Sequence, residues 1–206
     1  MKQGAHRLIA VFNKHKNVIN VEGDEMKYAI VIVDMINEFI DGILKIGRAK
    51  ELIPKIKSII TYARAHNIPV IYVSDSHLPE DTEFKVWGPH AITGSIGSQV
   101  IDELKPQPND IVLCKTKYSA FFGTSLDNVL RELGISTLIV TGVATNICIQ
   151  HTVADAFFRG YDVIVPQDCV DAFTDVDQKA GLDYMKKIYG SKIVTFDEVL
   201  KILGEK

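Results

Sequence analysis

Short apolar runs alternate with amphipathic segments along most of this chain, and no other feature constrains its fold as strongly. The runs are rich in Val, Ile and other strand-forming residues, and they cover 28–34, 68–75, 110–115, 136–142, 161–168 and 192–196. Segments with helical spacing follow them at 49–66, 125–133, about 148–158, 177–189 and 197–203. Strands that are apolar throughout are buried on both faces, and helices between them indicate parallel crossovers. The sequence therefore predicts a doubly wound, Rossmann-like α/β fold, with a mostly parallel six-stranded sheet and helices on both faces.

We interpret the chain as one globular domain, 26–206, preceded by a short extension. A chain of 206 residues can bury one full core. Residues 1–25 precede a second methionine, Met26, and form either an extension that is flexible or docks on the body, or an upstream start. The net charge of −3 gives no reason to expect a nucleic acid or a membrane as partner. Three cysteines without tight spacing are typical of a reducing compartment, so we expect a cytoplasmic protein.

Reactive residue types stand at the ends of the predicted strands. In open α/β sheets, ligands bind beyond the carboxyl ends of the strands, so these residues are expected to share one rim of the sheet. The first five strands deliver Asp34, Asp75 followed by His77, Lys115, the loop leading to Cys148, and Asp168. The rim would thus hold a base, a cation, a thiol and a pair of metal-ligand types. No G-x-G-x-x-G motif follows any strand, which argues against a dinucleotide site.

Cys148 lies where a strand passes into a helix, and this position favours a nucleophile. The helix N-terminus and a nearby Lys115 would stabilise a thiolate, and Asp34 would accept the thiol proton. Backbone N–H groups of the loop 142–148 lie near the sulfur and would stabilise an oxyanion. Two alternatives stay open: one is His151, one helical turn later, as a rival base, and the other is Cys148 as a packed core thiol beside an Asp34–Lys115 ion pair.

The irregular segment 74–90 carries metal-ligand residue types. Asp75 and His77 occupy alternate positions of an extended end, and His90 follows a loop that contains Glu80, Asp81 and Glu83. Histidines with carboxylates suit zinc or a similar divalent first-row metal. The alternative is a solvated loop with helix caps and unrelated histidines.

Four segments together resemble the signature segments of the isochorismatase-like cysteine hydrolases. They are VDMINEF (33–39), DSHLPEDTEFKVWGPH (75–90), KTKYSAFFGTSL (115–126) and GVATNICIQHTVADA (142–156), and the resemblance runs from about 27 to 196. Within that superfamily the segments are most similar to those of the nicotinamidases. The resemblance implies a catalytic set of Cys148, Asp34 and Lys115.

The resemblance also implies the surroundings of that set. It implies a cis peptide bond between Val143 and Ala144, with an oxyanion hole formed by the backbone N–H groups of Ala144 and Cys148. Substrate-binding side chains fall on Phe39, Trp87 and Tyr118, although ordinary core packing is the alternative for Phe39 and Trp87.

A metal site completes the implied family pattern. The ligand set falls on Asp75, His77 and His90, and Glu83 stands where many members have histidine. We expect one divalent metal per chain, zinc first, with iron or manganese as alternatives because Glu83 would supply a harder oxygen ligand.

The function implied by the resemblance is hydrolysis of nicotinamide to nicotinate and ammonia through a thioester on Cys148. The protein is expected to act on a small-molecule amide as a homo-oligomer, a dimer or a tetramer. A rival is an amidase for N-carbamoyl or ureido compounds, such as N-carbamoylsarcosine; those relatives keep the cysteine, aspartate and lysine but generally lack the full metal set. An isochorismatase proper and a non-catalytic binding protein of the same fold are weaker alternatives.

Overall fold

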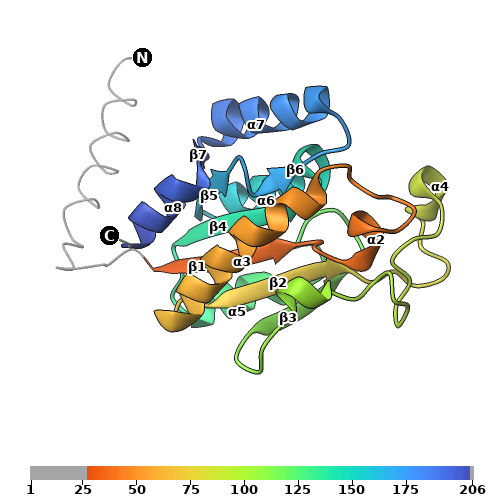
Figure 1. Ribbon diagram of the computed structural model, residues 1–206, viewed down its shortest axis with the longest axis horizontal. Coiled ribbons are helices and arrows are strands. Elements are labelled where there is room, and N and C mark those ends of the chain that lie inside the picture. The colour runs from red at the N-terminus through yellow and green to blue at the C-terminus, as the bar shows by residue number, and fades with distance from the viewer. Residues whose placement is uncertain (1–26, 205–206) are drawn as a thin grey trace, which may run out of the picture.

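A parallel sheet of seven strands forms the centre of the molecule in the computed structural model, which describes residues 27–204 (Figure 1). The strands are β1 (Tyr28–Val33), β2 (Val70–Asp75), β3 (Ile111–Lys115), β4 (Thr137–Val143), β5 (Asp162–Pro166), β6 (Val170–Asp171) and β7 (Lys192–Val194). Their order is β3-β2-β1-β4-β5-β7, with β6 paired to β4, so the chain builds outward in both directions from β1. The predicted doubly wound α/β fold is confirmed. The predicted extension, 1–25, lies outside the described residues.

The predicted strand number was wrong by one, because β6 is too short to show in the sequence. Along β4, only the first part, Thr137–Ile139, pairs with β5. Beyond it, the two residues of β6 pair with Gly142 and Val143. Two residues form no apolar run that can be distinguished from a loop.

Helices cover both faces of the sheet, as the sequence predicted. On one face lie α3 (Ala49–Ala65) and α8 (Phe196–Leu203), and on the other α5 (Leu126–Glu132), α6 (Gln150–Phe158) and α7 (Asp175–Tyr189). Side chains of β1 alternate between the two cores: Ile30 and Ile32 pack on the α3 side, Val31 and Val33 on the other. None of the described helices is long and apolar enough to cross a membrane.

Helix ends follow the expected local chemistry. Thr195 caps α8 in a capping box, in which its hydroxyl accepts from the N–H of Glu198 and the Glu198 carboxylate accepts from the N–H of Thr195. Gly190 ends α7 in the left-handed conformation. The sequence analysis missed three short pieces, α2 (Asn37–Ile40), α4 (Phe84–Trp87) and the 3-10 turn Asp102–Leu104.

β3 differs from the expectation that every strand is buried on both faces. It is an edge strand that pairs only with β2, and its first four residues alternate between partly buried and exposed positions. Val112 is 54% exposed, and Cys114 also faces outward. Lys115, by contrast, is buried at the carboxyl end of the strand.

Gly142 allows β4 to approach the end of β1 very closely. It adopts a φ of +112°, and a Cβ atom at this position would lie 1.9 Å from the carbonyl oxygen of Val33. Val33 immediately precedes Asp34, so this contact sets the distance between Asp34 and the loop that carries Cys148.

Gly142→Ala should therefore lower the free energy of unfolding by at least about 2 kcal/mol, because it adds both backbone strain and a steric clash. Gly47→Ala is the matched control, since its Cβ would meet nothing within 4 Å; it should stay within about 0.5 kcal/mol of wild type. Urea unfolding measures both variants. Equal stabilities would contradict the close approach of the two strands.

Candidate active site

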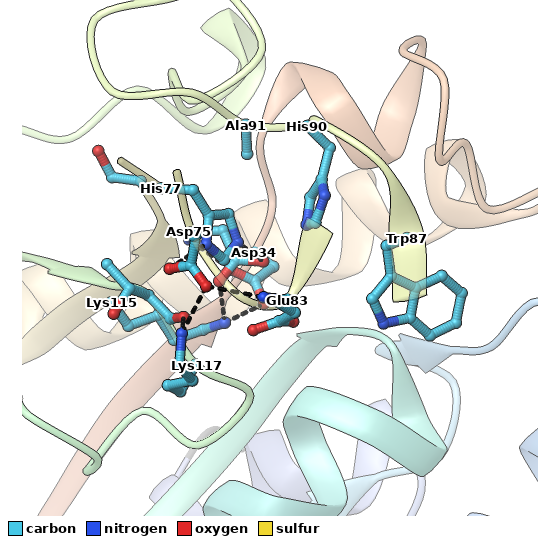
Figure 2. Close-up of polar contacts among 12 residues, drawn as sticks. Asp34, Asp75, His77, Glu83, Trp87, His90, Ala91, Lys115 and Lys117 are labelled. Atoms are coloured by element: carbon cyan, nitrogen blue, oxygen red, sulfur yellow. Dashed lines mark hydrogen bonds and ion pairs between the residues drawn. The ribbon is translucent and has the colours of Figure 1, made fainter. Parts of the chain in front are cut away.

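Four side chains from four chain segments meet at the carboxyl end of the sheet. One of them is Lys115, whose buried ammonium group contacts the other three. The Lys115 Nζ lies 2.8 Å from Asp34 Oδ2, 2.5 Å from Asp75 Oδ1 and 3.6 Å from Cys148 Sγ. Lys115 is 1% exposed and Cys148 5%. Figure 2 shows Lys115 facing the two carboxylates, with His77, Glu83 and His90 beside them. The structure thus brings together the three residues that the sequence analysis assigned to catalysis.

The sheet register places the charged members of this group. Asp75 and Lys115 are partners at the carboxyl ends of β2 and β3. Asp34 follows β1 with a φ of +56°, a left-handed conformation that turns the chain sharply. The backbone N–H of Asp75 donates to Asp34 Oδ1 at 2.8 Å, which ties the two strand ends together.

Cys148 lies in a π-helical turn, Thr145–Ile149, that joins β4 to α6. The sequence analysis expected an ordinary helix start here. The peptide bond between Val143 and Ala144, just before this turn, is cis. Because Cys148 belongs to this turn, it lies close to the first N–H groups of the helical segment. N–H groups at such a position can bind an anion.

Burial sets the protonation behaviour of the group. It raises the pKa of Asp34, Asp75 adds to this, and Lys115 opposes it, so that the pKa of Asp34 lies at about 7. Burial would lower the pKa of Lys115, but the two carboxylates outweigh it and hold the ammonium charged. Burial also raises the pKa of the Cys148 thiol well above its ordinary value, against the attraction of Lys115.

The raised pKa of Cys148 differs from the thiolate expected from the sequence. The helix N-terminus and Lys115 do not make Cys148 a resting thiolate, because the sulfur is buried and faces two carboxylates as well as one ammonium. The thiol is instead a proton donor placed beside a carboxylate with a pKa near neutrality. This pairing suits removal of the proton at the moment of attack.

Asp75, His77 and His90 form a second group next to the first. One ligand atom from each lies within 4.8 Å of the others, and all three residues are buried. The Nδ1 atom of each ring faces an oxygen that can only accept a hydrogen bond. His77 Nδ1 lies 3.2 Å from Asp81 Oδ2, and His90 Nδ1 lies 2.8 Å from the Gly88 carbonyl oxygen. Both Nδ1 atoms therefore donate, and in the neutral form of each ring the Nε2 atom is left with a lone pair.

These residues fit a divalent metal. His77 Nε2 is buried without a hydrogen-bond partner, 3.5 Å from Asp75 Oδ2. Asp75 contacts Lys115 through Oδ1, which leaves Oδ2 facing the His77 ring. Imidazole and carboxylate ligands suit zinc and its neighbours.

Glu83 lies at the edge of this metal-ligand group. Its carboxylate forms a close set with His77 and Asp81, outside the tighter set of Asp75, His77 and His90. Burial and Asp75 raise the pKa of Glu83. Glu83 also faces the same cavity as Asp75 and His90, so it is placed to join the ligands from one side.

A cavity opens above Cys148 and the metal-ligand group. Its walls are mostly aromatic and aliphatic: Phe39, Leu44, Trp87, Tyr118, Ile147 and Phe173. The indole N–H of Trp87 donates to the Tyr118 hydroxyl at 3.0 Å, and its ring stacks on Phe173 at 5.7 Å. Narrow walls of this composition suit a small, flat molecule.

Phe173 was missed in the sequence, because its stacking on Trp87 depends on tertiary contacts. Asp81 appeared there only as one of several carboxylates in a loop; its position four residues after His77 was the available signal.

Two other residues discussed from the sequence lie outside the site. Asp168 pairs with Lys55 at 2.9 Å and accepts from the N–H of Phe196, because β5 ends at Pro166 and β6 takes its place beside β4. His151 is exposed, and its Nδ1 contacts the Ile147 carbonyl at 2.7 Å, so it does not serve as base for Cys148.

Comparison with known proteins decides the family. A model of the isochorismatase domain matches residues 28–198. The chain belongs to the isochorismatase family. Family members are hydrolases that include amidases, so this isochorismatase-family protein is a hydrolase whose expected substrates are small-molecule amides.

Proteins similar to this isochorismatase-family chain are named for different amide substrates. Ureidoacrylate amidohydrolase RutB of Yersinia enterocolitica is 34% identical, over 82% of this chain and 86% of the relative. N-carbamoylsarcosine amidase of Thermoplasma acidophilum is 44% identical with a TM-score of 0.79, over 84% of this chain and 98% of that one.

Solved nicotinamidases and pyrazinamidases are also similar in structure. Nicotinamidase/pyrazinamidase PncA of Bacillus subtilis is 29% identical with a TM-score of 0.78, over 82% of this chain and 100% of that one. Pyrazinamidase of Pyrococcus horikoshii, solved in complex with zinc, is 27% identical with a TM-score of 0.75, over 82% and 99%.

Lys115→Met should lower the free energy of unfolding by about 3–5 kcal/mol, because it leaves two buried carboxylates without their cation. Adding Asp34→Asn should recover part of that loss by removing one of the two charges. Lys117→Met, at a lysine 36% exposed, is the control and should change stability by less than about 1 kcal/mol. Chemical unfolding in the presence of a chelator tests the set; a Lys115→Met protein as stable as this control would contradict the buried-pair account.

Proposed function

We propose that this protein is a metal-assisted cysteine amidohydrolase that converts nicotinamide to nicotinate and ammonia. One observation carries the proposal: the Cys148 thiol, with Asp34 and Lys115 beside it, opens into an aromatic cavity whose wall also holds Asp75 and His90, two members of the metal-ligand group with His77. The thiol provides the nucleophile, and the cavity with its metal-ligand group selects a flat ring that bears a nitrogen.

The proposed reaction uses residues of this chain at each step. The pyridine ring lies between Phe39 and Trp87, near Tyr118, and the carboxamide carbon faces Cys148. Asp34 removes the thiol proton as sulfur attacks the carbon, and the backbone N–H groups of Ala144 and Cys148 stabilise the oxyanion. The C–N bond breaks, and Asp34 gives its proton to the leaving nitrogen, which departs as ammonia. Asp34 then deprotonates a water that hydrolyses the thioester, releasing nicotinate and the free thiol.

Lys115 supports this proton transfer without contributing a proton. Its ammonium group lies against Asp34 and Asp75 and within 3.6 Å of the sulfur. It stabilises negative charge as that charge moves between the Asp34 carboxylate and the sulfur. A lysine can do this when buried only if its own charge is held by neighbouring carboxylates, as it is here.

Asp75, His77 and His90 would hold one divalent metal, zinc first, with Glu83 as a further ligand. When bound, the metal supplies a Lewis-acid centre that recognises a ring nitrogen and orients the ring. The residues present fit this group, because Asp75, His77 and His90 each offer a ligand atom within 4.8 Å of the others, while the Nδ1 atoms of both rings contact other partners. The zinc complex of the similar pyrazinamidase supports the choice of metal.

An N-carbamoyl or ureido amidase is the second candidate. The similarity to N-carbamoylsarcosine amidase, at 44% identity, and to ureidoacrylate amidohydrolase, at 34%, favours it. The same thiol, carboxylate and lysine would serve either substrate class. His90 in the wall of the same cavity as the thiol, together with the metal-ligand group to which it belongs, favours nicotinamide, since a carbamoyl substrate has no ring nitrogen to place there. For either substrate we also expect a cytoplasmic homo-oligomer, a dimer or a tetramer.

An ammonia-release assay separates the two candidates. The metal-loaded protein is tested on nicotinamide, pyrazinamide, N-carbamoylsarcosine and ureidoacrylate under one set of conditions. The proposal expects the highest kcat/KM for nicotinamide or pyrazinamide. A higher value for either ureido compound would put the second candidate first, and no ammonia from any of the four would contradict both.

Cys148→Ala should reduce amide hydrolysis by at least about 10³-fold, because it removes the nucleophile. Cys114→Ala and Cys169→Ala are the controls and should keep most of the activity, since Cys114 faces outward from the edge strand and Cys169 packs in the core. Steady-state rates and circular dichroism of the three proteins check this. Loss of activity in a folded control variant, or its retention in Cys148→Ala, would mean that another thiol acts.

Metal removal should weaken substrate binding more than chemistry. Chelation, or His77→Ala, should raise KM for nicotinamide at least about tenfold with a smaller change in kcat, because the metal orients the ring while Cys148 breaks the bond. His66→Ala, at an exposed histidine at the end of α3, is the control and should change neither constant. Elemental analysis accompanies the kinetics. Less than about a tenth of an equivalent of any transition metal, unrecovered on adding zinc, iron or manganese, would contradict the metal site.

A further inference from the structure

Asp81 lies behind the metal-ligand group, on the opposite side of the His77 ring from Asp75. Its side chain is 7% exposed and that of His77 is fully buried. Asp81 Oδ2 lies 3.2 Å from His77 Nδ1, and the other oxygen, Oδ1, accepts from Lys117 Nζ at 2.7 Å and from the backbone N–H of Glu83 at 2.9 Å. One carboxylate therefore contacts two of the expected metal ligands and a cation from the loop after β3.

The two oxygens of Asp81 have separate tasks, and only a carboxylate can perform both. Oδ2 accepts the proton of His77 Nδ1, which leaves the lone pair of Nε2 directed toward Asp75, 3.5 Å away. Oδ1 accepts hydrogen bonds from the Lys117 ammonium group and from the backbone N–H of Glu83. An asparagine has one oxygen and one NH₂ group. Its NH₂ group would therefore face either the N–H of His77 or the donors of Lys117 and Glu83, and a donor cannot bind a donor.

We propose that Asp81 is a positioning residue that fixes His77 in the Nδ1–H tautomer and thereby creates the metal-binding lone pair on Nε2. This inference rests on the proposed metal site, but it concerns a residue outside the proposed ligands Asp75, His77, Glu83 and His90. A carboxylate that accepts from the far nitrogen of a ligating histidine orients the ring and makes it a better ligand. Lys117 donates to Oδ1 of Asp81, the oxygen that does not contact His77.

Asp81→Asn provides the sharpest test because it preserves shape and can still accept from the N–H of Glu83. When its oxygen serves that N–H and Lys117, its NH₂ group faces His77, which must then accept on Nδ1 and carry its proton on Nε2. The metal-binding lone pair is lost. We expect zinc affinity, measured by competition with a chromophoric chelator, to fall about 10–100-fold.

Two controls separate this effect from a general disturbance of the loop. Glu80→Gln changes a neighbouring exposed carboxylate that makes no hydrogen bond or ion pair among the described residues. Lys117→Met removes the cation but leaves Asp81 Oδ2 on His77. Both variants should bind zinc within about threefold of wild type, well inside the loss expected for Asp81→Asn.

Nitrogen NMR of the metal-free protein provides a readout that a merely structural role would not change. The ¹⁵N shifts of the His77 ring are assigned with a His77→Gln variant and recorded at a pH where imidazoles are neutral. Wild type should carry its proton on Nδ1, and Asp81→Asn should carry it on Nε2. If Asp81→Asn does not fold, an Nε2–H tautomer in wild type alone overturns the inference.

The outcomes also distinguish this inference from the function on which it rests. Wild type that binds zinc, with Asp81→Asn binding equally well and keeping the same tautomer, overturns the role of Asp81 and leaves the metal site intact. Wild type that binds no zinc overturns the metal site itself, and with it the proposed role.

Discussion

The buried contact of Lys115 with Asp34 and Asp75 is the interaction on which the site depends. An ammonium group that is 1% exposed is stable only because two carboxylates lie within 2.8 Å of it. Those three residues end or follow three adjacent strands, so the sheet register fixes the geometry of the charges. Burial, and after it the neighbouring Asp75, raise the pKa of Asp34 to about 7, against the effect of Lys115. On its other side, Asp75 faces the His77 ring of the metal-ligand group.

The same arrangement favours a protonated thiol at rest for the proposed nucleophile. Burial raises the pKa of Cys148 in spite of Lys115, and the two carboxylates add to this. In the proposed reaction, a carboxyl group with a pKa of about 7 is a suitable acceptor only if the sulfur begins to bond to carbon as the proton leaves. Activation would then be coupled to the presence of a substrate. The aromatic cavity above Cys148 would select which amide reaches it.

Much of this could be predicted from the sequence, because it depends on strands whose residues are apolar throughout. Asp34, Asp75 and Lys115 stand at strand ends, and parallel strands bring their carboxyl ends together. β6 and Phe173 could not be predicted, since pairing of two residues and stacking on Trp87 depend on tertiary contacts. The thiol pKa was also beyond the sequence, because it depends on how deeply Cys148 is buried. Asp168 stands after a predicted strand, but β6 displaces it from the rim toward Lys55.

Trapping of the covalent intermediate tests the central claim most directly. The metal-loaded protein is mixed with nicotinamide, quenched in acid within the first turnovers, digested and analysed by mass spectrometry. The account predicts a nicotinoyl thioester on the peptide that contains Cys148, and none on those that contain Cys114 or Cys169. A nicotinoyl group on another residue, or unmodified Cys148 during rapid ammonia release, would contradict it.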